Sequence, residues 1–444
     1  MKTTLTVISL FSATLLSAGS FSFSAQALPE AGGCVTAQCH PSIVKAKNVH
    51  PVAEPCDTCH QATAAPHPQK KKQTFKLVQA LPGLCSQCHP PFGTMKYVHA
   101  PVKNGACTAC HNPHASDEPK LLVRPTKDLC GACHADKTKH AYVHGPTATG
   151  DCTACHNPHE SGKKALLVKD SPDLCFICHV DMQGEMKKKV VHSAIESGCT
   201  SCHNPHGSAA KKLLAAEGAK LCFQCHSQIE DRLTKAKVVH PPVRSAKGCA
   251  SCHAPHASDN GKLLIKTGKD LCLDCHTGVI KKDQTVLHGP IQKGTCTPCH
   301  DPHGSSYDKL LSKEFLPDFY ISYSDTQYQL CFSCHNRDLL RYPTTTYATG
   351  FRDGNKNLHY VHVNRQDRGK SCKACHVMHA GELPKLIAVS VPFGKWNLPL
   401  KFVKTDTGGS CAPGCHKKYT YDRKTPGKAP EPAKAGDKEK GKGK

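Results

Sequence analysis

Cysteine and histidine are the residue types in this chain whose number and spacing could do chemistry. The 444 residues include 30 cysteines and 31 histidines. Cys-x-x-Cys-His occurs thirteen times, and two wider variants at 34–40 and 411–416 have four and three residues between their cysteines. Every cysteine belongs to one of these fifteen pairs: Cys34 and Cys39, Cys56 and Cys59, Cys85 and Cys88, Cys107 and Cys110, Cys130 and Cys133, Cys152 and Cys155, Cys175 and Cys178, Cys199 and Cys202, Cys222 and Cys225, Cys249 and Cys252, Cys272 and Cys275, Cys296 and Cys299, Cys331 and Cys334, Cys372 and Cys375, Cys411 and Cys415.

The motif spacing predicts covalent haem attachment. Two cysteines about one turn apart can bond the two vinyl groups of one porphyrin, and the histidine that follows then faces the iron. Zinc sites and disulfide frameworks give no reason for a histidine after every second cysteine. We expect about fifteen haem c groups, the two variant motifs included, with these histidines as first axial ligands: His40, His60, His89, His111, His134, His156, His179, His203, His226, His253, His276, His300, His335, His376 and His416.

Sixteen histidines lie outside the motifs, and fourteen of them recur in phase with the motifs, which predicts a second axial ligand for each iron. Seven precede a motif: His50, His99, His144, His192, His240, His288 and His362. Seven follow one, mostly as Cys-His-x-Pro-His: His67, His114, His159, His206, His256, His303 and His379. His140 and His359 remain as candidates for the Cys34–Cys39 haem. The spacing leaves open whether each of these histidines binds an iron of its own unit or an iron of a neighbouring unit.

These residues form a two-haem unit repeated seven times, with first cysteines at 107, 152, 199, 249 and 296 in the regular stretch. So short a unit cannot enclose each porphyrin in a globule, so haem faces must replace an aliphatic core. The expected fold is mostly irregular with short α-helices, an extended multihaem cytochrome c built of two-haem repeats around a chain of stacked haems. Without haem the chain is expected to be largely disordered.

Composition along the chain predicts four segments. Residues 1–27 read as a signal peptide, with an apolar stretch followed by Ala25-Gln26-Ala27 as cleavage site. Residues 28–303 form the regular multihaem repeats, 304–425 a C-terminal multihaem region with longer insertions, and 426–444 a disordered tail rich in Lys, Pro and Gly. We expect an exported protein, in the periplasm or alternatively outer-membrane-associated or extracellular, with no transmembrane segment after cleavage.

The formal charge of +23 does not require a nucleic-acid partner. Loss of Lys2 leaves +22, and thirty propionates with fifteen ferric cores would bring the total to +7. Full reduction would bring it to −8. The basic polypeptide therefore serves as compensation for propionates.

The quoted motifs resemble those of the doubled Cys-x-x-Cys-His multihaem cytochromes of metal-reducing and sulfate-reducing bacteria. The units Cys107 to His114 and Cys199 to His206 carry the resemblance, which spans about 34–416. It implies electron transfer in the periplasm or across the outer membrane, in anaerobic or extracellular respiration. The implied partners are other cytochromes, a quinol-oxidising complex or an outer-membrane porin. Fifteen motifs and a longer-spaced C-terminal third depart from the pattern, so no single partner carries over.

We expect an electron carrier with no catalytic residues. Two imidazoles on each iron leave no position for substrate, and Cys-x-x-Cys-Lys is absent from the sequence. Two alternatives remain open. One is a multihaem reductase acting on nitrite, hydroxylamine or a sulfur oxyanion, and the other is a subunit of an extracellular cytochrome filament.

Overall fold

The computed structural model describes residues 33–36, 38–69 and 71–425. The predicted signal peptide and the predicted tail lie outside these residues. The described residues fall into two compact units, one within Met1–Lys137 and Gly145–Lys169, the other within Thr138–His144 and Asp170–Lys444. No helix of the described part has both the length and the apolar character needed to cross a bilayer.

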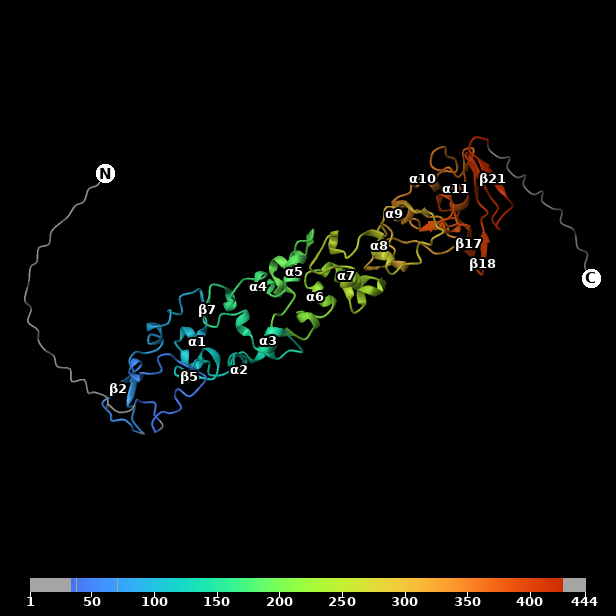
Figure 1. Ribbon diagram of the computed structural model, residues 1–444. Coiled ribbons are helices and arrows are strands. Elements are labelled where there is room, and N and C mark those ends of the chain that lie inside the picture. Colours follow the sequence, from blue (N-terminus) through green and yellow to red (C-terminus); the bar gives the residue numbers. More distant parts are fainter. Residues whose placement is uncertain (1–32, 37, 70, 426–444) are drawn as a thin grey trace, which may run out of the picture. The chain divides into compact units, whose positions relative to one another are not determined.

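The α-helices are short, as the sequence predicted (Figure 1). Most of them either contain the first cysteine of a motif or follow a motif histidine, so they serve local attachment rather than a helical core. They are α1 (Ala100–Lys103), α2 (Thr126–Gly131), α3 (Gly145–Thr149), α4 (Asp173–Phe176), α5 (Val180–Glu185), α6 (Ala219–Phe223), α7 (Ser227–Lys235), α8 (Gly268–Leu273), α9 (Gly289–Gln292), α10 (Asp338–Arg341) and α11 (Leu358–Val363).

Six antiparallel pairs of two-residue strands join neighbouring repeats. In each pair, the strand before an upstream histidine meets the strand after the second histidine of the next unit. The pairs are β1 (Asn48–Val49) with β5 (Ala115–Ser116), β4 (Tyr97–Val98) with β7 (Glu160–Ser161), β6 (Tyr142–Val143) with β9 (Gly207–Ser208), β8 (Val190–Val191) with β11 (Ala257–Ser258), β10 (Val238–Val239) with β13 (Gly304–Ser305), and β12 (Val286–Leu287) with β16 (Ala380–Gly381).

The remaining strands are local. Near the start, β2 (His60–Ala62) pairs with β3 (Phe75–Leu77). In the C-terminal region, the sheets are β14 (Arg352–Asp353) with β15 (Lys356–Asn357), β17 (Ser390–Phe393) with β18 (Trp396–Pro399), and the three-stranded β19 (Val403–Lys404), β20 (Gly408–Cys411) and β21 (Tyr419–Asp422). No closed sheet forms among the described residues, and these strands gather where α10 and α11 lie (Figure 1).

Apolar packing differs between the repeats and the C-terminal region. Within the described residues up to 312, the buried apolar side chains are Ile291 and four alanines, Ala53, Ala115, Ala210 and Ala257. Beyond residue 312 two clusters form, one of Tyr328, Leu340 and Val363 and the other of Ala388, Val391 and Leu400. The fold is therefore irregular, as predicted, and the repeats bury too little aliphatic surface to be held by it.

Candidate haem sites

The regular Cys-x-x-Cys-His motifs fold as tight turns that bring their cysteines and histidine together. In the 107–111 motif, the amide of Cys110 donates to the carbonyl of Cys107 at 3.2 Å, and the amide of His111 donates to the same carbonyl at 3.0 Å. The motifs that begin at Cys152, Cys199 and Cys249 repeat both bonds within 0.1 Å. This geometry places two sulfurs about one turn apart, as two thioether bonds to one porphyrin require.

The histidine rings lie in close pairs, and in most pairs the two ring planes are nearly parallel. A metal–imidazole bond of about 2.0–2.1 Å on each side, with about 1.1 Å from nitrogen to ring centroid, separates two centroids across one metal ion by about 6.3 Å. The observed centroid distances run from 5.9 to 6.4 Å. Each pair can therefore accept an iron between its rings, and the residues present fit a haem with two imidazole ligands.

Second-motif histidines face the upstream histidine of their own unit. The pairs are His89 with His50, His134 with His99, His179 with His144, His226 with His192, His276 with His240, His335 with His288, and His416 with His362. Most of these rings are nearly parallel, whereas His50–His89 and His362–His416 are tilted by 47° and 37°.

First-motif histidines face the second histidine of the following unit. The pairs are His60 with His114, His111 with His159, His203 with His256, His253 with His303, and His300 with His379. His156 and His206 occupy the corresponding positions of the repeat. The structure thus uses both arrangements that the sequence left open, one for each motif type.

The two ends of the series depart from the sequence hypothesis. His40 of the Cys34 motif faces His67 at 6.0 Å, so neither His140 nor His359 is its partner. The Cys34 motif behaves as the first motif of a preceding unit, since it takes the second histidine of unit one. His359 instead faces His376 at 6.4 Å. His140 packs against Gly207 and has no ring partner among the described histidines.

The two predicted second ligands at each unit junction are tied together by their backbones. The amide of His192 donates to the carbonyl of His256 at 2.8 Å, next to the β8–β11 pair. The same bond joins His50 to His114, His99 to His159, His144 to His206, His240 to His303, and His288 to His379. The short strands therefore fix two ligand positions at once, which explains why two-residue strands recur here.

Hydrogen bonds also orient the upstream histidines. The Nδ1 atom of His144 lies 2.8 Å from the carbonyl oxygen of Pro205, and that of His240 lies 2.9 Å from Pro302. His99 and His192 make the same contact with Pro158 and Pro255. A carbonyl can only accept, so Nδ1 carries the proton and Nε2 is left to bind iron.

Six first-motif histidines, from His111 to His376, use a left-handed turn for the same purpose. The Nδ1 atom of His203 lies 2.9 Å from the carbonyl oxygen of Lys212, nine residues later. Lys212 and Leu213 have φ of 59° and 57°, a conformation that costs non-glycine residues about 1–2 kcal/mol each. Five further motifs repeat this turn, at Lys120–Leu121, Ala165–Leu166, Lys262–Leu263, Lys309–Leu310 and Lys385–Leu386. Strain that recurs beside these six histidines marks a positioning function.

Glycine substitution tests this strain. Lys211 and Lys212 are adjacent and exposed, but only Lys212 has a positive φ. Glycine adopts positive φ freely, so the Lys212→Gly variant is expected to be more stable than the Lys211→Gly variant. The expected difference in the free energy of unfolding is about 1–2 kcal/mol. Denaturant unfolding of the haem-loaded protein, followed by Soret absorbance, measures the difference. Equal midpoints for the two variants would show that the turn is unstrained.

Burial keeps the C-terminal imidazoles in the neutral form that binds metals. It lowers the pKa of His359 to about 3, and it also lowers the pKa of His362 and His376. Burial likewise lowers the pKa of His379 in the same region and of His256 and His303 in the repeats. These shifts disfavour protonation, which would otherwise compete with iron for the same nitrogen.

Attachment cysteines of successive motifs lie side by side. The first cysteines of a second motif and of the next first motif are within hydrogen-bonding reach, as in Cys85 with Cys107, Cys130 with Cys152, Cys222 with Cys249, Cys272 with Cys296, and Cys331 with Cys372. Cys34 and Cys56 make the same contact at the start of the series. Within a unit, Cys110 lies near Cys133, and Cys252 lies near Cys275. Successive attachment sites are thus neighbours in each compact unit.

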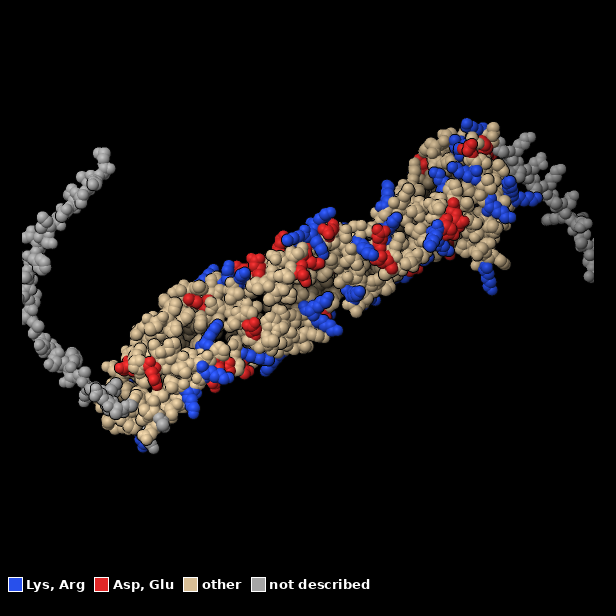
Figure 2. All heavy atoms as spheres, viewed as in Figure 1, with Lys and Arg blue, Asp and Glu red and all other residues tan. Residues whose placement is uncertain are grey.

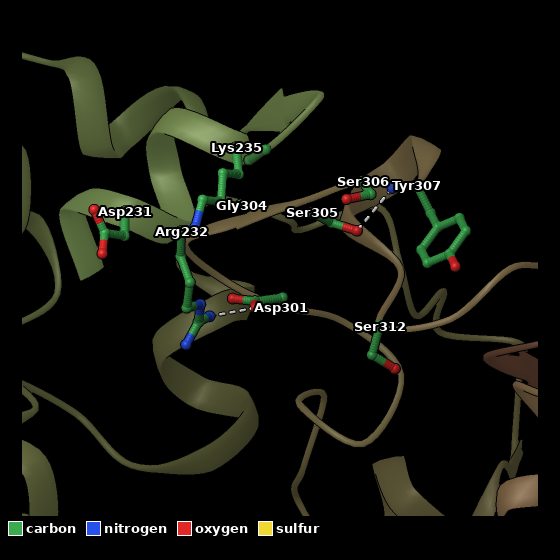
Figure 3. A pocket seen from close by; sticks show the side chains of 10 residues that line it. Asp231, Arg232, Lys235, Asp301, Gly304, Ser305, Ser306, Tyr307 and Ser312 are labelled. Atoms are coloured by element: carbon green, nitrogen blue, oxygen red, sulfur yellow. Dashed lines mark hydrogen bonds and ion pairs between the residues drawn. The ribbon is translucent and has the colours of Figure 1, made fainter. Parts of the chain in front are cut away.

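A pocket lined by charged and polar residues lies beside the site formed by His253 and His303. It is bordered by α7 and the 301–312 loop, and Arg232 of α7 forms an ion pair with Asp301 across it (Figure 3). Asp301 also accepts from the amide of His303 at 3.1 Å, in the place that asparagine holds in three other units. The ion pair therefore braces the turn that presents His303 toward His253.

Cysteine turns with facing imidazoles define the class of multihaem c-type cytochromes. A family model described as the doubled CXXCH motif matches the chain at residues 99–139, 144–184, 192–231, 240–281 and 288–339. Each match begins at an upstream histidine and includes both motifs of one unit. The chain belongs to the multihaem c-type cytochromes with this doubled motif, which bind haem c covalently and generally transfer electrons. A search of curated proteins found no match.

Proposed function

We propose that this protein relays electrons through about fifteen haems with two histidine ligands each. The observation that carries the proposal is the succession of facing imidazole pairs whose attachment cysteines are neighbours. Haem supplies a reversible one-electron couple at each site. The paired histidines would hold a haem at each site, and the neighbouring attachment cysteines would place successive haems next to one another, which would suit electron transfer between them.

The residues have distinct parts in this relay. The motif histidines would supply one imidazole at each site, and the spare histidines other than His140 would supply the other. Carbonyls of the left-handed turns and of the prolines accept the Nδ1 protons, which fixes ring orientation and raises imidazole basicity. Two imidazoles leave the potential lower than a methionine ligand would.

The proposed location is outside the cytoplasm, in the periplasm or at the outer membrane, because c-type multihaem cytochromes are typically exported. Lys and Arg alternate with Asp and Glu over the face shown in Figure 2. Such a mixed surface suits brief encounters with other redox proteins rather than a polyanion. Other cytochromes, a quinol-oxidising complex or an outer-membrane porin are the proposed partners.

Haem count and spin state test the relay. Intact mass of protein from its native host is expected to show fifteen haems, and electron paramagnetic resonance of the oxidised protein is expected to show low-spin iron only. The tilted pairs at His89 and His416 are expected to give low-spin signals separate from the nearly parallel majority. A substantial high-spin population, or turnover of nitrite or hydroxylamine, would favour the reductase instead, and fewer than thirteen haems would contradict the motif assignment.

A further inference from the structure

The site formed by His359 and His376 differs from every other first-motif site of the described chain. We propose that His359 is the distal ligand of the haem attached at Cys372 and Cys375, and that the enclosure of this site gives that haem the most positive potential of the series. This inference rests on the proposed function.

His359 replaces a histidine that a following unit would provide. It lies on α11, upstream of its partner in sequence, and its ring is 14° from parallel with His376. Its Nδ1 lies 2.9 Å from Oγ1 of Thr349. A hydroxyl thus stands where the first-motif and upstream histidines of the repeats have a backbone carbonyl.

The helix that carries His359 is anchored by a fully buried asparagine. The Oδ1 atom of Asn357 accepts from the amides of His359 and Tyr360, at 3.1 and 3.2 Å. Its Nδ2 donates to the carbonyls of Leu339 and Tyr342, at 3.0 and 2.9 Å. All of these bonds are internal, so the position of His359 is fixed independently of any other unit.

Apolar side chains enclose the attachment cysteines. The cluster of Tyr328, Leu340 and Val363 packs against Cys372, and the cluster of Ala388, Val391 and Leu400 packs against Cys375. Ala374, between the two cysteines, is 2 % exposed. Among the described residues, no other motif has both its cysteines packed against clusters of this kind.

Enclosure and nearby positive charge act in the same direction. The ferric haem core carries one more positive charge than the ferrous core, and a low-dielectric surrounding penalises that charge. Lys370 acts electrostatically on Cys375 and His362 beside this site, which disfavours the ferric form further. The reduced form is therefore favoured here relative to the half-exposed sites of the repeats, and electrons at equilibrium collect at this haem.

Stepwise reduction of the haem-loaded, full-length protein tests the assignment. The His359→Ala variant is expected to lose one low-spin haem of about fifteen, and the component that is reduced first in the parent protein is expected to disappear from its low-spin signal. His288→Ala is the matched control, because His288 faces His335 at a more exposed site. It is expected to remove one low-spin haem that is reduced later.

A second variant leaves the ligand in place. Thr349→Val removes the acceptor for Nδ1 of His359, which makes the imidazole less basic, so the first component is expected to move to a still more positive potential with haem count and spin state unchanged. If His359→Ala instead removes a low-spin haem that is reduced late in the parent protein, the inference about enclosure is wrong. The assignment of His359 as a ligand would still hold. If it leaves every haem low-spin, the ligand assignment itself is wrong.

Discussion

Produced without haem attachment, the mature chain is expected to show no cooperative unfolding transition over its repeats. The described residues between 33 and 312 bury only Ile291 and scattered alanines among their apolar side chains. Strand pairs of two residues and turns of three cannot offset the chain entropy lost on folding. Haem faces must therefore supply the interior, and their loss is the largest change the chain can undergo.

Far-ultraviolet circular dichroism and thermal unfolding of the haem-free protein, beside the haem-loaded protein, measure this effect. The haem-free repeats, produced as residues 28–303, are expected to give a featureless melting curve. The full haem-free chain can retain residual structure only where the two apolar clusters of the C-terminal region lie. A colourless repeat region that melts cooperatively would refute the role given to haem.

Removal of one upstream histidine is expected to convert about one haem in fifteen to the high-spin state. His192 faces His226 at 6.2 Å, so His192→Ala leaves that iron with a single imidazole. His140→Ala is the control, because His140 has no ring partner among the described histidines and packs against Gly207. The control is expected to keep every haem low-spin.

Methionine at the same position separates a ligand from a packing residue. His192→Met is expected to keep the iron low-spin and to raise the potential of one haem, since a methionine ligand favours the ferrous form. Electron paramagnetic resonance and stepwise reduction measure both effects. High-spin iron in His140→Ala, or none in His192→Ala, would overturn the pairing scheme.

Much of the site could be predicted from the sequence because covalent chemistry fixes the motif spacing. The cysteine pairs, the fourteen phased histidines and the irregular fold with short helices follow from that constraint. The partner of each histidine could not be predicted. Pairing within one unit and pairing between adjacent units give the same spacing of histidines along the sequence. The partner of His40 was left open between His140 and His359 for a related reason: an isolated histidine does not recur at the repeat period, so its spacing indicates no particular motif.

Other features lacked a signal that single-residue propensity could detect. Left-handed backbone at Lys212–Leu213 is disfavoured for both residues, so propensity argues against it. A recurring Lys-Leu-Leu or Ala-Leu-Leu nine residues after the motif histidine was nevertheless present as a clue. In the C-terminal region, the packing of Tyr328 and its neighbours around Cys372 depends on tertiary contacts that no periodicity encodes.

The exchange of histidines between adjacent units also sets an order of maturation. A ribosome makes the chain from its amino terminus, so in the proposed scheme a first-motif iron waits for the next unit to emerge before its second ligand arrives. Until then it would stay open on one side, even when the second-motif haem of the same unit has already met the upstream histidine made before it. The haem attached at Cys372 and Cys375 would not have to wait, because its proposed distal ligand His359 is made before Cys372.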